Sequence, residues 1–215
     1  MMHAASAPAT IGNRRPAGAA GFRLWRMDSP AAQDASTPDD QQLMLAYIAG
    51  DEAAFATLYA RHRLGLYRFL LRHLRDEALA EELFQDIWQK IISARLGWKP
   101  DAPFHAWLYR IAHNRLNDYW RARKHRPTAP EDADARIASL HDEHTPEHAL
   151  SEFEERRRLQ LALEALPDEQ RTVLLLRLEQ EMTLEEIGQV TGYGRETVKS
   201  RLRYAMDKLR ARLKP

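Results

Sequence analysis

The strongest constraint on the fold is a succession of two helical patterns, separated by a glycine turn, in residues 183–213. Thr183 and Glu186 fit the S/T-x-x-E capping box, in which each side chain bonds an unpaired backbone N–H at a helix start. Gly192 can adopt the positive φ at which many helices end. The next segment places its apolar residues on one helical stripe: Val198, Leu202, Met206, Leu209 and Leu213. A capped helix, a glycine turn and an amphipathic helix in this order predict a helix-turn-helix.

The helix after the turn is strongly basic. Residues 191–215 contain only Glu196 and Asp207 as acids, against the bases Arg195, Lys199, Arg201, Arg203, Lys208, Arg210, Arg212 and Lys214. Such a local excess attracts DNA phosphates even though the net charge of the whole chain is only +1. The N-terminal part of a recognition helix is the part that meets base edges. The pattern therefore indicates a DNA-binding segment.

A second basic block and an acidic segment precede this helix. Residues 105–126 carry several arginines and one acid, Asp118, whereas residues 131–155 are rich in acids and contain Arg136 as their only Lys or Arg. We interpret this segregation of charge as two nucleic-acid contacts, joined by a linker that avoids DNA.

The composition excludes several classes of protein. The chain has no cysteine, which rules out disulfides and thiolate metal sites and fits a reducing cytoplasm. No apolar run approaches the roughly 20 residues of a membrane span, so we expect no membrane insertion. Residues 1–38 are rich in Ala, Pro, Ser and Gly and lack a helical stripe, which predicts a disordered N-terminal tail. Met27 is an alternative start, because periodic sequence begins only near Asp39.

Helical periodicity predicts the remaining architecture. Asp51 and Asp76 each precede an apolar stripe and fit the position of a helix cap. No alternating strand pattern occurs. We therefore expect an all-α protein of two small helical bundles, residues 39–126 and 151–215, joined by a flexible acidic linker over residues 127–150.

Three motifs in the first expected bundle carry a family resemblance. They are DEAAF at residues 51–55, AEELFQD at 80–86 and FHAWLYRIAHN at 104–114. Together they look like region two of a sigma factor, and the C-terminal helix-turn-helix looks like region four. With these two regions and a short linker, the chain resembles the extracytoplasmic-function, or group four, sigma factors of bacterial RNA polymerase over roughly residues 39–213.

The resemblance implies a factor that binds core RNA polymerase and directs promoter-specific transcription initiation, with no catalysis of its own and no cofactor or metal. Residues 39–126 would bind the polymerase and would recognise and melt the minus-ten promoter element. Residues 151–215 would recognise the minus-thirty-five element. The implied partners are core polymerase, through its largest-subunit clamp and its flap, together with promoter DNA and an anti-sigma factor.

The resemblance also implies site residues, carried over position by position. The polar positions expected on the polymerase clamp are Glu82, Gln85, Asp86 and Gln89, while the apolar neighbours Leu83, Phe84, Ile87 and Trp88 are better explained as core. The minus-ten candidates, in a loop and the helix after it, are Lys99, Asp101, Asn114, Arg115, Asp118, Tyr119, Arg121 and Arg123. The loop would hold a base flipped out of the non-template strand. The minus-thirty-five candidates are Arg195, Glu196, Lys199, Ser200 and Arg203, with Arg171 on the DNA backbone.

Three other interpretations compete with these. Trp98 could stack on a base, although we prefer a role in anchoring the loop. The helix-turn-helix could belong to an ordinary transcriptional regulator that needs no polymerase docking. His141, His144 and His148 would share a helical face and could hold the metal of a metal-dependent enzyme, but they lie in an acidic linker and no acid-base or nucleophile constellation accompanies them.

Overall fold

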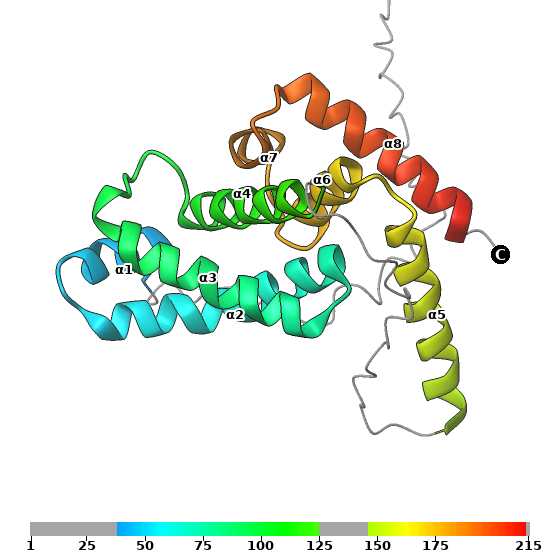
Figure 1. Ribbon diagram of the computed structural model, residues 1–215, viewed down its shortest axis with the longest axis horizontal. Helices are drawn as coiled ribbons and strands as arrows, with labels where there is room; N and C mark the ends of the chain where they lie inside the picture. Colours follow the sequence, from blue (N-terminus) through cyan, green and yellow to red (C-terminus); the bar gives the residue numbers. More distant parts are fainter. Residues whose placement is uncertain (1–37, 125–145, 214–215) are drawn as a thin grey trace, which may run out of the picture. The chain divides into compact units, whose positions relative to one another are not determined.

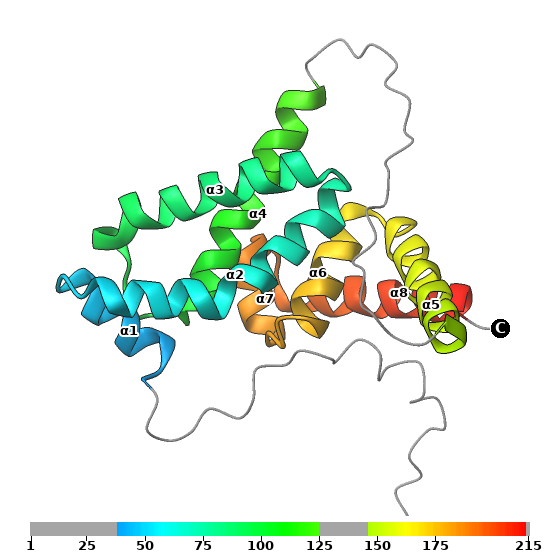
Figure 2. The same ribbon diagram turned by 90° about the horizontal axis from the view of Figure 1, so that it is seen from below.

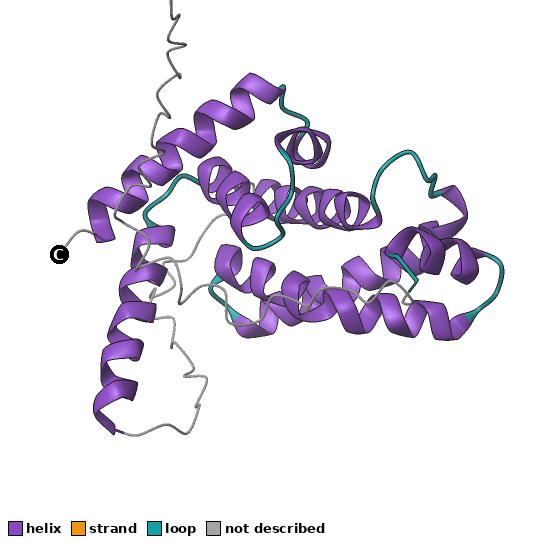
Figure 3. Ribbon diagram, turned by 180° about the vertical axis from the view of Figure 1, so that it is seen from behind, coloured by secondary structure: helices purple, strands orange, loops and turns teal. Residues whose placement is uncertain are grey.

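The computed structural model describes residues 38–124 and 146–213, and all regular structure in these two ranges is helical (Figures 1 and 3). The first bundle comprises α1 Asp40–Ile48, α2 Glu52–Leu74, α3 Glu77–Ala94, the short 3₁₀ helix η1 Arg95–Gly97 and α4 Phe104–Lys124. The second bundle comprises α5 Pro146–Glu164, α6 Asp168–Leu178, α7 Leu184–Thr191 and α8 Arg195–Leu213. The predicted all-α fold with a C-terminal helix-turn-helix is therefore confirmed.

The predicted N-terminal tail and most of the predicted linker lie outside the described residues. Helix α5 begins at Pro146, about one turn before residue 151, where we expected the second bundle to start. Proline is well suited to this first helical position, because its missing backbone N–H would have no helical partner there.

Aspartate side chains cap the first three helices of the first bundle, α1, α2 and α3. Asp51 accepts a hydrogen bond from the backbone N–H of Ala53 at 2.9 Å, and Asp76 accepts one from that of Leu79 at 3.0 Å. Both predicted caps are confirmed, and caps of this kind contribute about 1 kcal/mol each. Asp39 begins α1 in the same way, within a capping box.

Helix α3 supplies one wall of the first core and packs against α2 and α4. The four apolar residues that we interpreted as core, Leu83, Phe84, Ile87 and Trp88, are at most 8 % exposed, which confirms that interpretation. The polar residues between them remain on the outer face of the helix. Because the apolar residues of α3 face the core, the polar residues expected to contact the polymerase lie on the opposite, exposed face of the helix.

Helix α6 is the central helix of the second bundle. Its consecutive residues Val173, Leu174, Leu175 and Leu176 are completely buried, although they point in different directions around the helix. Such a helix needs neighbours on all sides. Helices α7 and α8 both pack against α6, and α5 packs against α8. The helix-turn-helix formed by α7 and α8 is thus supported by α6.

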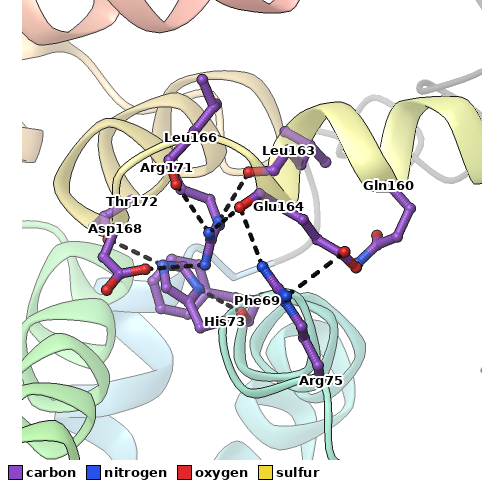
Figure 4. Close-up of polar contacts among 10 residues, drawn as sticks. All are labelled: Phe69, His73, Arg75, Gln160, Leu163, Glu164, Leu166, Asp168, Arg171 and Thr172. Carbon is purple, nitrogen blue, oxygen red and sulfur yellow. Dashed lines mark hydrogen bonds and ion pairs between the residues drawn. The ribbon is translucent and has the colours of Figure 1, made fainter. Parts of the chain in front are cut away.

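A buried arginine joins α5 to α6. Arg171 is 4 % exposed, and its guanidinium donates to the carbonyl oxygens of Leu163 at 3.0 Å, Glu164 at 2.9 Å and Leu166 at 2.9 Å (Figure 4). It also donates to the Asp168 carboxylate at 3.1 Å. These bonds satisfy carbonyls that the end of α5 leaves without helical partners. The structure therefore corrects our expectation that Arg171 contacts the DNA backbone, because its donors are already used inside the bundle.

A polar contact joins α2 of the first bundle to α6 of the second. His73 Nδ1 lies 2.8 Å from the carbonyl oxygen of Phe69, and His73 Nε2 lies 2.9 Å from Thr172 Oγ1 (Figure 4). Because Nδ1 must donate to the carbonyl, Nε2 of the neutral ring accepts the hydroxyl proton. Burial lowers the pKa of His73 to about 4, and the nearby Arg171 and His113 also lower it.

The first prediction concerns Arg171. Replacement of Arg171 by Met should lower the free energy of unfolding by roughly 3 kcal/mol, because three buried carbonyl oxygens lose their donor. Urea denaturation followed by circular dichroism measures this change. The matched control is Arg203→Met on an exposed position of α8, which should change stability by less than about 0.5 kcal/mol. Equal stabilities of the two variants would contradict the structural role of Arg171.

The second prediction concerns pH. The folded state keeps His73 neutral, whereas a histidine exposed by unfolding has a pKa near 6.5, so this stabilisation is complete above pH 6.5 and is lost as the pH falls toward 4. Between pH 7 and pH 5 the residue should account for a loss of roughly 2 kcal/mol of unfolding free energy. Urea denaturation at both pH values should show a smaller loss for His73→Gln. An identical pH dependence in both proteins would show that His73 is not held neutral.

Candidate nucleic-acid interface

The predicted capping box and glycine turn of the helix-turn-helix are both confirmed. The Glu186 backbone N–H donates to Thr183 Oγ1 at 3.2 Å, and the Thr183 N–H donates to the Glu186 carboxylate at 2.7 Å. Gly192 ends α7 with a φ of +76°. A Cβ at Gly188 would lie 2.9 Å from the carbonyl oxygen of Tyr193, so the small residue makes room for the backbone of the turn.

Three residues that the sequence analysis did not single out fix α8 against α6. The guanidinium carbon of Arg201 lies 3.7 Å from the centroid of the Tyr193 ring, a cation–π contact. Arg201 also pairs with the Glu169 carboxylate at 2.6 Å, and the Tyr193 hydroxyl donates to the same carboxylate at 3.4 Å. The three side chains come from α8, the turn and the first turn of α6. They therefore set the direction in which the recognition helix leaves the bundle.

The minus-thirty-five candidates lie together at the N-terminal half of α8. Arg195, Glu196, Lys199 and Arg203 are exposed, and Ser200 is half-buried. The basic groups have acidic neighbours: Arg195 pairs with Glu185 at 2.5 Å, and Lys199 lies 3.6 Å from Glu196. Exposed ion pairs contribute little free energy, so DNA phosphates can replace these partners. This part of α8 has the exposure and charge that DNA contact requires.

The loop before α4 forms a small cavity with the start of that helix. The cavity has a volume of about 130 Å³ and is lined by Gly97, Trp98, Lys99, Asp101, Ala102, Ala106, Trp107, Arg110 and Gln189. We call it the α4 pocket. Trp98 is only 6 % exposed, which confirms that it anchors the loop. Lys99 and Asp101 are both exposed at the pocket, in keeping with their predicted place.

Two pocket residues were missed by the sequence analysis. Arg110 lies one helical turn after Trp107 and Ala106, so the i, i+3 and i+4 spacing alone could have placed it on the same face. Gln189 belongs to α7 of the second bundle, and its position results from tertiary packing of α7 on α4. No pattern in the sequence indicates that contact.

The other minus-ten candidates occupy the C-terminal half of α4, away from the pocket. Asn114, Asp118, Arg121 and Arg123 are exposed, while Arg115 and Tyr119 are half-buried. At 1.5 Å per residue, Asp118 lies roughly 16 Å along the axis from Trp107 at the pocket. The predicted minus-ten residues therefore form two groups. Lys99 and Asp101, the pocket group, lie at the pocket, and the others lie on the C-terminal half of α4.

One ion pair connects the predicted polymerase face to the predicted minus-ten helix. Arg115 Nε donates to the Asp86 carboxylate at 3.0 Å, and both side chains are half-buried between α3 and α4. Glu82, Gln85 and Gln89 are exposed on α3. Three of the four residues expected to contact the polymerase clamp are therefore exposed, whereas the carboxylate of the fourth, Asp86, pairs with Arg115.

No helix within residues 38–124 and 146–213 is both long and apolar enough to span a bilayer. Among the side chains described in these ranges, no group of histidines and acids is arranged to hold a metal ion. The side chains of His141, His144 and His148 lie outside the described set.

Comparison with known proteins gives matches over both bundles. The family models described as "Sigma-70 region 2" and "Sigma-70, region 4" match residues 58–126 and 162–211. The RNA polymerase sigma-H factor of Pseudomonas aeruginosa is 30 % identical over 182 residues, which cover 82 % of this chain and 94 % of that protein. The ECF RNA polymerase sigma factor SigM of Mycobacterium tuberculosis is 32 % identical over 173 residues, covering 79 % and 82 %.

A solved structure agrees with these matches. The structure of CnrH in complex with the cytosolic domain of CnrY resembles this fold with a TM-score of 0.59 and 25 % sequence identity, over 80 % of this chain and 95 % of that chain. The chain therefore belongs to the sigma-70 family. Within that family it is a sigma factor of the extracytoplasmic-function group, which directs transcription. An ordinary regulator with one helix-turn-helix is not favoured, because it leaves the region two match unexplained.

Proposed function

We propose that this sigma factor binds core RNA polymerase through the exposed face of α3 and contacts a promoter at two separate elements. The pocket group and the C-terminal half of α4 would contact the minus-ten element, and the N-terminal half of α8 would contact the minus-thirty-five element. The observation that carries this proposal is the helix-turn-helix, whose basic residues Arg195, Lys199 and Arg203 are exposed on the first half of its second helix.

The domain assignment forms part of the proposal. We assign residues 39–126 to region two. We assign residues 151–215, together with the first turn of α5 that precedes them, to region four. The segment between the two regions is then a connection. The factor acts in the cytoplasm, where the polymerase is, and performs no chemistry of its own. The similar protein CnrH forms a complex with the cytosolic domain of CnrY. By analogy, we propose an anti-sigma protein as a further partner of this chain.

Reconstitution tests the proposal as a whole. The purified chain is mixed with core RNA polymerase, and transcripts are mapped on genomic DNA. We expect start sites that appear only when both proteins are present. Transcription by core polymerase that is unaffected by the chain would contradict the proposed function.

The third prediction concerns the recognition helix. Lys199→Ala and Arg203→Ala should each weaken promoter binding by the polymerase complex by about 1–3 kcal/mol if the side chain contacts a base edge. If the side chain contacts a phosphate, the slope of log affinity against log salt concentration should fall by about one. Binding is measured by fluorescence anisotropy at several salt concentrations. The matched control is Lys208→Ala, an exposed lysine farther along the same helix. Losses no larger than those of the control would remove the first half of α8 from the DNA interface.

The fourth prediction concerns polymerase docking. The double variant Glu82→Arg with Gln89→Arg should bind core polymerase at least tenfold more weakly, because it changes the charge of the proposed contact face. It should keep its helical content, since both positions are exposed on α3. The control Glu77→Arg makes the same Glu-to-Arg change on another face of α3. Binding assays with labelled core should separate the two variants, and equal affinities would show that the docking face is misplaced.

A further inference from the structure

The turn between α7 and α8 consists of Gly192, Tyr193 and Gly194, so Tyr193 supplies its only side chain. Glycine leaves the backbone free to adopt many conformations, and a Cβ at either of these two glycines would meet no atom within 4 Å. The backbone of the turn therefore does not by itself fix the angle between the two helices. Helices α6, α7 and α8 pack against one another (Figures 1 and 2), and Tyr193 lies where contacts to all three are available.

Tyr193 makes a contact with each of these helices. Its carbonyl oxygen lies close to α7, at the position where only the glycine of Gly188 leaves room for it. Its ring faces the guanidinium of Arg201 in α8, and its hydroxyl donates to the Glu169 carboxylate in the first turn of α6. Arg201 Nη2 lies 2.6 Å from the same carboxylate. We call Glu169, Tyr193 and Arg201 the turn cluster. Each of its three side chains contacts the other two.

Arg201 differs from the other basic residues in the first half of α8. Its side chain is 20 % exposed, whereas those of Arg195 and Lys199 are 61 % and 63 % exposed. Successive residues of an α-helix are rotated by about 100°, so Arg201 lies roughly 200° from Lys199 around the axis of α8. One of its guanidinium nitrogens, Nη1, is buried. Arg201 therefore faces α6 and not the side of α8 that carries the proposed minus-thirty-five residues.

A small rotation of α8 is enough to change what its exposed residues can contact. Arg203 lies roughly 12 Å along the axis from Arg195, so a rotation of about 10° at the start of the helix shifts Arg203 by roughly 2 Å. Hydrogen bonds to base edges need donor–acceptor distances of about 2.7–3.2 Å, and a shift of this size breaks them. Attraction to phosphates acts over roughly 10 Å and survives the same shift. The angle of α8 therefore affects recognition of sequence more than attraction to DNA.

We propose that the turn cluster positions the recognition helix: it holds α8 at the angle at which its exposed residues read the minus-thirty-five element. The proposal rests on the proposed function and adds three positioning residues to it. Loss of the cluster lowers discrimination between promoter sequences and leaves the phosphate contacts in place. Arg201, although it lies in a basic helix, then acts through Glu169 and Tyr193 and not through a phosphate.

Substitution of Tyr193 tests the proposal on the complex of the full chain with core polymerase. The measured quantity is the ratio of its affinities for a mapped promoter duplex and for the same duplex with a scrambled minus-thirty-five element. Tyr193→Leu removes the aromatic ring and should lower this ratio at least fivefold, which is about the effect of losing one base contact. Tyr193→Phe keeps the ring over Arg201 and should stay within twofold of the parent. The control Tyr67→Leu makes the same change on α2 and should leave the ratio unaltered.

Two further variants separate positioning from DNA contact. Glu169→Gln removes the charge that holds Arg201 and should also lower the ratio, whereas Glu155→Gln makes the same change at an exposed position of α5 and should not. If Tyr193→Leu loses helical content by circular dichroism, Glu169→Gln replaces it. Arg201→Gln should lower the ratio while the slope of log affinity against log salt concentration stays that of the parent, because no phosphate contact is lost.

The outcomes distinguish this proposal from the proposed function. Ratios for Tyr193→Leu and Glu169→Gln that both lie within twofold of their controls would overturn the positioning role. A slope that falls by about one in Arg201→Gln would overturn it as well, because Arg201 would then contact a phosphate. Equal affinities of the parent complex for the two duplexes would instead contradict the proposed recognition of a minus-thirty-five element.

Discussion

The second bundle depends on the buried guanidinium of Arg171. A buried charge is costly unless its donors are satisfied, and three carbonyl oxygens and the Asp168 carboxylate satisfy this one. These bonds fix the start of α6 against the end of α5. The first turn of α6 also carries Glu169, which pairs with Arg201 of α8. The direction of the recognition helix therefore follows from how α6 is held.

Helix α6 also connects the two bundles. The hydroxyl of Thr172, the residue after Arg171, donates a hydrogen bond to His73 Nε2 of the first bundle. The neighbouring contacts between bundles are ion pairs and hydrogen bonds, while the apolar residues Val173 to Leu176 are buried. Ion pairs and hydrogen bonds therefore contribute to the contact between the bundles.

Local features of the fold could be predicted from the sequence. The caps at Asp51, Asp76 and Thr183 and the turn at Gly192 depend on residues close together in the chain, and all were confirmed. The motifs that indicated the family were also local. Helix α5 begins at Pro146, before residue 151, and proline suits the first turn of a helix.

Tertiary features of the candidate site could not be predicted in the same way. The sequence identifies Arg171 as a basic residue at a helix start, and only the structure shows that it is buried and donates to carbonyls at the end of α5. Asp86 and Arg115 were assigned to different partners, yet they form an ion pair across α3 and α4. Gln189 reaches the α4 pocket from the second bundle. Each of these contacts joins residues whose pairing depends on how helices pack.

The central claim is that one chain contacts two promoter elements while bound to polymerase. Hydroxyl-radical footprinting of the complex on a mapped promoter tests it most directly. We expect two protected segments about 25 base pairs apart. The upstream one should be lost when five base pairs are inserted between them, because half a helical turn places it on the opposite side of the duplex. A single protected segment that is unaffected by the insertion and by the presence of core polymerase would contradict the account.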